Sequence, residues 1–291
     1  MNKIERSCPI CSSTSKTLVF TDYNRREGYT ELIADYVTCD DCSMQYLTNI
    51  PDFQSFAETY EDIYVNPDIE KLKARLAPSP KKNGKKVLDI GCNHGTQLIP
   101  FYNKGYEIYG IDLNKKAIED CKKYLPSDHF FHSTVEGLDF EDDSFDVITT
   151  SHVLEHVYDL DTFLSSVYRL LKRGGTFTIK VPHGRSLEML VWGKYSSQSW
   201  VPFHINMFDQ KSITHILKKH GFESIKTSTN PYPWWWILSY RQWAGTINAQ
   251  RGVTNFHQNI FHKALQVLIF PILFIIAKMG YGEELEVTCN K

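Results

Sequence analysis

Four cysteines in two close pairs form the strongest chemical pattern in the N-terminal part of the chain. They lie in Cys8-Pro-Ile-Cys11 and Cys39-Asp-Asp-Cys42. Four thiolates can surround zinc tetrahedrally, and since four sulfurs leave no open coordination position, such a site is structural rather than catalytic. The alternative is two unrelated pairs of reduced thiols. The short apolar and aromatic runs between the pairs, broken at Gly28, favour a β-ribbon that needs the metal to fold. We therefore expect a zinc ribbon over residues 1–50.

A second chemical pattern is the glycine-punctuated turn VLDIGCNHG at residues 87–95. Gly91 and Gly95 allow the backbone to turn sharply and approach a ligand closely, and the helix expected after Gly95 presents its positive N-terminal end. Asp89 ends the strand before the turn. Asp112 ends the next strand, about twenty residues after the turn, where a carboxylate can accept hydrogen bonds from a ribose diol. The alternative for both carboxylates is capping of strand ends.

These residues must be positioned by alternating strands and helices, which begin at residue 86. Strands are expected at 86–90, 107–112, 130–133, 145–149 and 176–181, and helices at 95–104, 115–124 and 160–171. The alternation predicts an α/β fold with βαβ units around a mostly parallel sheet, whose strand ends form a ligand crevice. A mostly helical connection is expected over 51–85, with aromatic residues from Phe53 to Tyr64 and a helix at about 68–76.

The composition describes an ordinary globular protein. The chain has 291 residues, of which 42% are hydrophobic and 23% charged, enough for one large domain with an appendage. Its net charge of -2 provides no overall field that would attract nucleic acid. The N-terminal residues lack the apolar core of a secretory signal, so we expect a reducing cytoplasm and few disulfides.

Further motifs resemble a known family. The turn resembles the DxGxGxG motif of class I S-adenosylmethionine (SAM) methyltransferases, with Asn93 in place of the middle glycine. LDFEDDSFDVITTSHVLEHV at 138–157 and LKRGGTFTIKVP at 171–182 resemble the segments around the fourth and fifth strands of that family. The resemblance covers residues 86–230. It implies a Rossmann-like core with a mostly parallel seven-stranded sheet over 86–291, with an aromatic and apolar insertion at about 231–280.

The resemblance also implies a SAM site. Asp89, Gly91, Asn93 and Gly95 would surround the methionine part, with Cys92 as a neighbour, and Asp112 with Leu113 would hold the ribose and the adenine edge. Thr134, Val135 or Glu136 would meet the adenine, and which of them does so stays open. Ser151 and His152 would lie over the sulfonium and the acceptor pocket. Cys121 and Cys289 are expected to be packing residues.

Four histidines compete for the role of acceptor base, for which a pKa near neutrality is suited: His152, His156, His183 and His204. The position in the family favours His152 and His204, and the alternative for each is a helix cap or a core residue. The Glu155-His156 pair resembles a feature of ubiquinone-type O-methyltransferases that can hold a divalent ion. Because Ser151 and His152 stand where further carboxylates would help, we do not expect a catalytic metal.

The complete layout resembles a subgroup of bacterial surface-polysaccharide and secondary-metabolite pathways, a match that FHINMFDQKSITHILKKHGF at 203–222 strengthens. That resemblance suggests a sugar or related small molecule as the acceptor, methylated by in-line attack on SAM. One alternative is an RNA-modifying enzyme that grips RNA with the ribbon, although the low net charge and the acidic Asp40-Asp41 argue against it. Another is a scaffold that binds SAM without catalysis.

The C-terminal third contains two unusual segments. PYPWWWILSYRQW at 231–243 is expected to pack as core or lid, with sugar stacking as the alternative. The uncharged run at 264–277, interrupted by Pro271, is too short to span a bilayer. It is expected to cover the sheet or line the acceptor site, and the alternative is a peripheral membrane contact towards a lipid-linked substrate.

Overall fold

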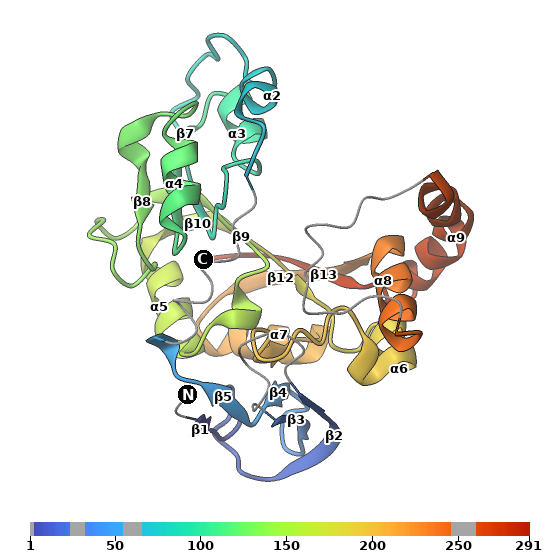
Figure 1. Ribbon diagram of the computed structural model, residues 1–291. Helices are drawn as coiled ribbons and strands as arrows, with labels where there is room; N and C mark the ends of the chain where they lie inside the picture. The colour runs from blue at the N-terminus through green and yellow to red at the C-terminus, as the bar shows by residue number, and fades with distance from the viewer. Residues whose placement is uncertain (1–2, 24–32, 55–65, 246–259) are drawn as a thin grey trace.

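The computed structural model describes residues 3–23, 33–54, 66–245 and 260–291. Its centre is a seven-stranded sheet in the order β12-β13-β10-β9-β6-β7-β8 (Figure 1). In chain order the strands are β6 (Lys86–Ile90), β7 (Glu107–Asp112), β8 (Phe130–His132), β9 (Phe145–Ser151), β10 (Leu171–Pro182), β12 (Glu223–Asn230) and β13 (Glu284–Asn290).

Only one strand of this sheet runs against the others, because β13 pairs antiparallel with both β10 and β12 while the remaining pairs are parallel. The α/β class and the mostly parallel seven-stranded sheet are therefore confirmed. The central strand β6 buries Val87, Leu88 and Ile90, as expected for a strand covered on both faces. The covering helices include α3 (Ile99–Asn103), α4 (Lys115–Cys121), α5 (Leu160–Leu170) and α7 (Gln210–Lys219).

Two of these helices are shorter than the sequence predicts. The helix expected at 95–104 begins only at Ile99. A turn precedes it, in which Leu98 N–H donates a hydrogen bond to Gly95 O. The helix expected at 115–124 ends at Cys121 in a tight turn before Pro126. In the connection, α2 (Ile69–Lys73) is capped by Asp68, whose side chain accepts from Lys71 N–H. Most of the aromatic stretch expected between Phe53 and Tyr64 lies outside the described residues.

The N-terminal strands form a separate layer, which we call the ribbon unit. It comprises β1 (Lys3–Glu5), β2 (Lys16–Tyr23), β3 (Ile33–Cys39), β4 (Gln45–Leu47) and β5 (Asn49–Pro51). The strand β11 (Asn206–Met207) pairs with β4 and completes a four-stranded sheet in the order β11-β4-β3-β2. Gly28, where the ribbon is expected to break, lies outside the described residues. The ribbon unit thus shares a sheet with a loop of the methyltransferase-like core.

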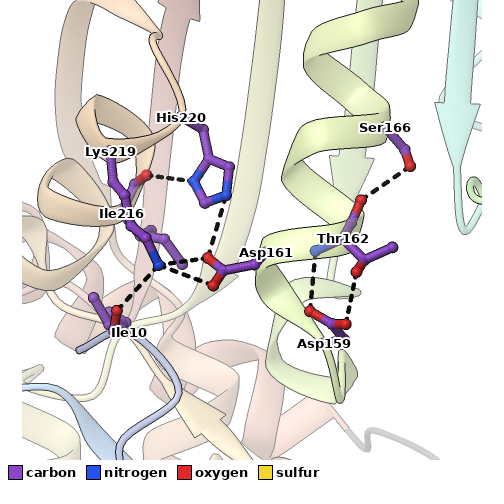
Figure 2. A network of polar contacts seen from close by, with 8 residues as sticks. All are labelled: Ile10, Asp159, Asp161, Thr162, Ser166, Ile216, Lys219 and His220. Carbon is purple, nitrogen blue, oxygen red and sulfur yellow. Dashed lines mark hydrogen bonds and ion pairs between the residues drawn. The ribbon is translucent and has the colours of Figure 1, made fainter. Parts of the chain in front are cut away.

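Polar contacts attach the ribbon unit to two core helices. The Lys219 ammonium at the end of α7 contacts both carboxylate oxygens of Asp161 on α5, at 2.7 and 2.9 Å, and donates to Ile10 O at 3.4 Å (Figure 2). His220 also contacts Asp161, at 3.2 Å (Figure 2). A single network therefore joins the first cysteine pair, α5 and α7.

Three further helices lie together at the right of the view in Figure 1, and we call them the helical flank: α6 (Leu187–Trp192), α8 (Pro233–Trp243) and α9 (Ile260–Lys278). Along the chain, α8 and α9 lie between β12 and β13. The Trp192 ring of α6 packs at 6.2 Å from both Tyr240 and Trp243 of α8. Within the described residues, no helix combines the length and apolar character needed to cross a bilayer.

Candidate active site

A cavity of about 360 Å³ lies at the carboxyl ends of β6, β7 and β9. This volume falls within the range of roughly 300–1,000 Å³ that is typical of small-molecule sites, and the position is the usual ligand crevice of a parallel sheet. Eight of the residues singled out from the sequence line it: Gly91, Asp112, Leu113, Thr134, Val135, Glu136, His152 and His156.

The glycine turn forms one wall of the cavity. Gly91 has a φ of +73°, and a Cβ at this position would lie 2.2 Å from Val153 Cγ2, so that a side chain here would collide with the loop after β9. The N–H groups of Gly91 and Cys92 both donate to Ile111 O, at 2.8 and 2.9 Å. These bonds tie the turn to the end of β7, which carries Asp112.

Asp112 is buried and holds the local backbone in place. Its carboxylate accepts from Asn93 N–H at 2.8 Å and from Asn114 N–H at 2.7 Å. Burial raises the pKa of Asp112, and these two N–H groups oppose the rise because they stabilise the charged form. The carboxylate therefore fixes the turn and also faces the cavity, which fits a role in ribose binding.

The loop after β8 forms the next wall. Ser133, Thr134, Val135 and Glu136 all line the cavity, so its lining does not distinguish among the three residues expected near the adenine. Ser133 was not expected from the sequence. Its N–H donates to Asp112 O at 3.3 Å, which places the loop beside the ribose-side carboxylate.

Five other residues expected at the cofactor do not line the cavity: Asp89, Cys92, Asn93, Gly95 and Ser151. Asp89 is 1% exposed, and its pKa is raised well above the usual value by burial and by the nearby charge of Asp112. Cys92 packs with Cys121 and Leu98 in an apolar cluster. Gly95 has a φ of +72°, and a Cβ there would lie 2.6 Å from Leu125 Cδ1. Asp89, Cys92 and Gly95 are thus buried in or beside the turn, whereas Asn93 is exposed.

His152 occupies the acceptor side, directly after β9, with a φ of +57°. Its Nδ1 lies 3.3 Å from Glu155 Oε1 and its Nε2 lies 3.3 Å from Glu284 Oε2. Burial disfavours the charged ring, but the bonds to both carboxylates outweigh it and raise the pKa of His152 to about 10. Since the side chain is still 37% exposed, it can meet a molecule in the cavity as an imidazolium.

Of the other three candidate histidines, His183 and His204 are buried and His156 is half-buried. His156 Nδ1–H donates to Phe203 O at 2.8 Å, and His204 Nδ1–H donates to Gln198 O at 2.6 Å, with the two rings 4.9 Å apart. Burial lowers the pKa of both and brings that of His204 to about 3. His183 bridges Gly282 O and the Gln210 side chain, at 2.9 and 3.1 Å. Neither His183 nor His204 lines the cavity.

Glu155, His156 and His204 bring one possible metal-ligand atom each to within 4.8 Å of one another. Glu155 is fully buried, yet its pKa is lowered, because the bond from His152 and the neighbouring histidines outweigh the cost of burial. His152 faces both Glu155 and Glu284, so one imidazolium meets two carboxylates and the group keeps one net negative charge. Glu155, His156 and His204 are therefore the residues here that could hold a cation.

Sequence reasoning missed Glu284, whereas Trp235 lies in the aromatic segment 231–243 that was expected to pack as core or lid, with sugar stacking as the alternative. Glu284 opens β13, more than a hundred residues after His152, and reaches the site because β13 pairs with β10 in the register Glu284↔Pro182. The Trp235 ring of α8 lies 6.0 Å from His152, edge to face. The acidic start of the last strand, GEELEV, was the only local signal for the first of these residues.

Comparison with known proteins agrees with this geometry. A family model described as "Methyltransferase domain" matches residues 62–227, which is more than half of the chain. This chain belongs to the class I SAM-dependent methyltransferase family. The expectation of a SAM-dependent methyltransferase is confirmed.

The curated relatives share only part of their length with this methyltransferase. A ubiquinone biosynthesis O-methyltransferase of Cereibacter sphaeroides is 28% identical over 178 residues, which are 57% of this chain and 72% of the relative. The uncharacterized methyltransferase YcgJ of Bacillus subtilis is 30% identical over 138 residues, 46% of this chain and 54% of the relative. The chain therefore spans about half of one relative and about three quarters of the other.

A solved structure supports the fold. The crystal structure of a SAM-dependent methyltransferase from Archaeoglobus fulgidus superposes with a TM-score of 0.50 and 21% identity, covering 82% of this chain and all of that chain (100%). At this identity the likeness concerns the Rossmann-like architecture alone.

Proposed function

We propose that this methyltransferase transfers the methyl group of SAM to a hydroxyl oxygen of a small-molecule acceptor, with a sugar or related molecule as the first candidate. The observation that carries the proposal is His152, which faces the cavity while Glu155 and Glu284 hold its two ring nitrogens. SAM supplies an activated methyl group. The protein has to position the acceptor and remove its proton.

The His152 cluster can remove that proton if the acceptor hydroxyl takes the place of Glu284 at Nε2. With two carboxylate partners the ring stays protonated, since its pKa is about 10. With one partner, Glu155 at Nδ1, the ring resembles a carboxylate-oriented histidine base, whose pKa lies closer to neutrality. Binding of the acceptor would thus make the ring release its Nε2 proton to solvent, and the neutral Nε2 would then accept the proton of the acceptor hydroxyl as the oxygen attacks the methyl group.

The aromatic wall beside His152 supports a sugar acceptor. Tyr232 and Trp235 stack with ring centroids 4.9 Å apart and an interplanar angle of 20°, and Trp235 adjoins His152. Aromatic rings next to carboxylates suit a molecule with an apolar ring face and several hydroxyl groups.

A second candidate acceptor carries a more acidic hydroxyl, as on an aromatic ring. The positive charge on His152 would favour such an acceptor, because an ionised oxygen pairs with the imidazolium directly. The similarity to an O-methyltransferase of ubiquinone biosynthesis is consistent with this candidate.

Glu284→Gln tests the proposal. In the wild type, kcat/KM should rise with pH up to about 10, because His152 must lose its proton in the free enzyme. Removal of the Glu284 charge lowers the His152 pKa, so the rise should shift to lower pH, while His152→Gln should lose at least about a hundredfold in kcat. SAM affinity by calorimetry serves as the control and should stay within twofold or so in both variants. An unshifted profile in Glu284→Gln would contradict the role given to His152.

We also propose that the ribbon unit holds a structural zinc ion. The Sγ atoms of Cys8 and Cys42 lie 3.4 Å apart, and those of Cys11 and Cys39 lie 3.5 Å apart. Tetrahedral zinc with Zn–S bonds of about 2.3 Å requires a sulfur spacing of roughly 3.8 Å, close to these values. Each cysteine pair also forms a turn of the same kind. Ser12 N–H donates to Cys8 O in the first turn and Ser43 N–H donates to Cys39 O in the second, each at 2.9 Å.

A further inference from the structure

The outer face of α9 is apolar and exposed. Val267 and Leu268 are each 73% exposed and Ile275 is 62% exposed, whereas Leu273 and Ala277 on the opposite side are buried. A helix of a globular protein normally turns its apolar side to the core and its polar side to water. Here apolar residues occupy both sides, so the outer face requires a partner.

The apolar surface continues over the rest of the helical flank. Tyr240 and Trp243 of α8 are more than half exposed, as are Leu190 and Val191 of α6. The three helices lie together on one side of the molecule, at the right of the view in Figure 1. Exposed apolar side chains gathered on neighbouring helices in this way mark a binding surface for a protein or a membrane.

The charge of this part of the chain favours a membrane over a protein as the partner. From Ser224 to Gly282 the sequence contains no Asp or Glu, although the whole chain contains 34 such residues. Lys263 and Lys278 stand near the two ends of α9 and are exposed. The Lys278 ammonium lies 5.2 Å from the centroid of the Phe274 ring, so its stem follows the apolar surface while its charge remains at the edge.

We propose that the helical flank binds the surface of an anionic lipid bilayer, with α9 lying in the plane of the membrane. Its apolar face would enter the boundary between headgroups and acyl chains, and Lys263 and Lys278 would contact lipid phosphates. Pro271 lies inside the helix, and no described helix can cross a bilayer, both of which agree with an in-plane orientation. The exposed Trp243 and Tyr240 suit the headgroup level.

The same charges disfavour a second copy of this chain as the partner. A twofold dimer places the same surface against itself. With α9 packed antiparallel across the axis, Lys263 of one copy would approach Lys278 of the other without acidic residues nearby in the sequence to neutralise them. An anionic membrane provides the missing negative charge.

The surface adjoins the active site through α8. Trp236 Nε1–H donates to Glu283 at 2.8 Å, and Tyr232 N–H donates to the same carboxylate at 2.6 Å, which fixes the start of α8 beside Glu284. A lipid-linked acceptor could therefore reach His152 from the membrane. This last step rests on the proposed function, but membrane binding itself does not.

Co-sedimentation with vesicles tests the proposal in the absence of SAM and acceptor, so that a failure is independent of the methylation chemistry. The full chain should bind vesicles that contain phosphatidylglycerol at least about tenfold more tightly than pure phosphatidylcholine vesicles. The double change Leu268→Glu and Ile275→Glu should reduce binding by more than about tenfold. A matched change at two exposed residues of β2, Leu18→Glu and Val19→Glu, should leave binding unaltered.

Lys263→Gln with Lys278→Gln should remove most of the preference for phosphatidylglycerol and keep the SAM affinity. Three results would overturn the proposal: no binding of the wild type to either vesicle, equal losses in the α9 and β2 variants, or a dimer in light scattering that the α9 change converts to monomers. The last result would assign the surface to contact between copies.

Discussion

The ribbon unit and the helical flank are both additions to one seven-stranded sheet, and they differ in what their surfaces contact. The ribbon unit is joined to the core by polar bonds and by strand pairing: Arg6 donates to Asn206 Oδ1 at 2.9 Å, and β11 completes its sheet. The flank is also held by polar bonds, such as that from Trp236 Nε1–H to Glu283 at 2.8 Å, but many apolar residues on its outer side are exposed. The ribbon unit therefore bonds to the core close to the active site, whereas the flank presents an apolar surface to the solvent.

This difference bears on the active site. Tyr36 of the ribbon unit donates to His204 O at 2.6 Å, and Asn206, beside it, donates to Leu154 O and Val157 O at 3.0 and 2.7 Å. These bonds hold the short helix η2 (Leu154–His156), which contains Glu155, the orienting partner of His152. We infer that damage to the ribbon unit spreads to the site, whereas changes on the outer face of the flank stay local.

The largest effect is expected from loss of the zinc site. Cys39→Ser should abolish zinc content and cost at least about 3 kcal/mol of stability, because a structural zinc site contributes its binding energy to folding. Methyl transfer should fall with it. Metal analysis and thermal unfolding provide the readout, and Asp41→Asn, an exposed change in the same cysteine pair, is the control that keeps both. If the zinc-free Cys39→Ser protein kept its full stability, folding of the core would not depend on the zinc site of the ribbon unit.

A smaller loss is expected at the junction between the two layers. Arg6→Met should cost about 2 kcal/mol, because it leaves the side-chain oxygen of the buried Asn206 without its donor from the ribbon unit. Urea denaturation measures the loss, and Arg75→Met at an exposed position should change the midpoint little. Equal effects of the two changes would mean that the junction does not depend on the buried guanidinium.

The smallest effect is expected on the flank. Ile275→Glu should alter stability by no more than about 0.5 kcal/mol, because the side chain is 62% exposed and gains little from folding. Thermal unfolding and SAM affinity should both match the wild type. If stability fell by more than about 2 kcal/mol, the residue would have to be covered in the protein in solution.

The sequence was most informative where the signal is local. The apolar run of Val87 to Ile90 identified a central strand, and the paired cysteines identified the cluster in the ribbon unit, because neighbouring residues determine both. It was least informative where distant segments meet. Glu284 joins His152 only through the register of β13, and β11 joins the ribbon unit only through a pairing across more than a hundred and fifty residues.

The histidines illustrate the same limit. From their positions in the sequence, His152, His156 and His204 were all reasonable candidates for the base. Their charge states, however, depend on burial and on neighbouring residues that are distant in the sequence. Two carboxylates raise the pKa of His152, while burial lowers that of His204 to about 3. Only one of the three is therefore charged at neutral pH and exposed to the cavity.

The most direct test of the central claim is to incubate the full chain with methyl-labelled SAM and an extract of its host, and then to separate small molecules, glycans, lipids, RNA and protein. We predict label on an oxygen of a small molecule, glycan or lipid-linked acceptor, and none with Asp112→Ala, whose loss should weaken the SAM site. Label confined to RNA or protein, or no transfer from a protein that binds SAM, would contradict the proposed function.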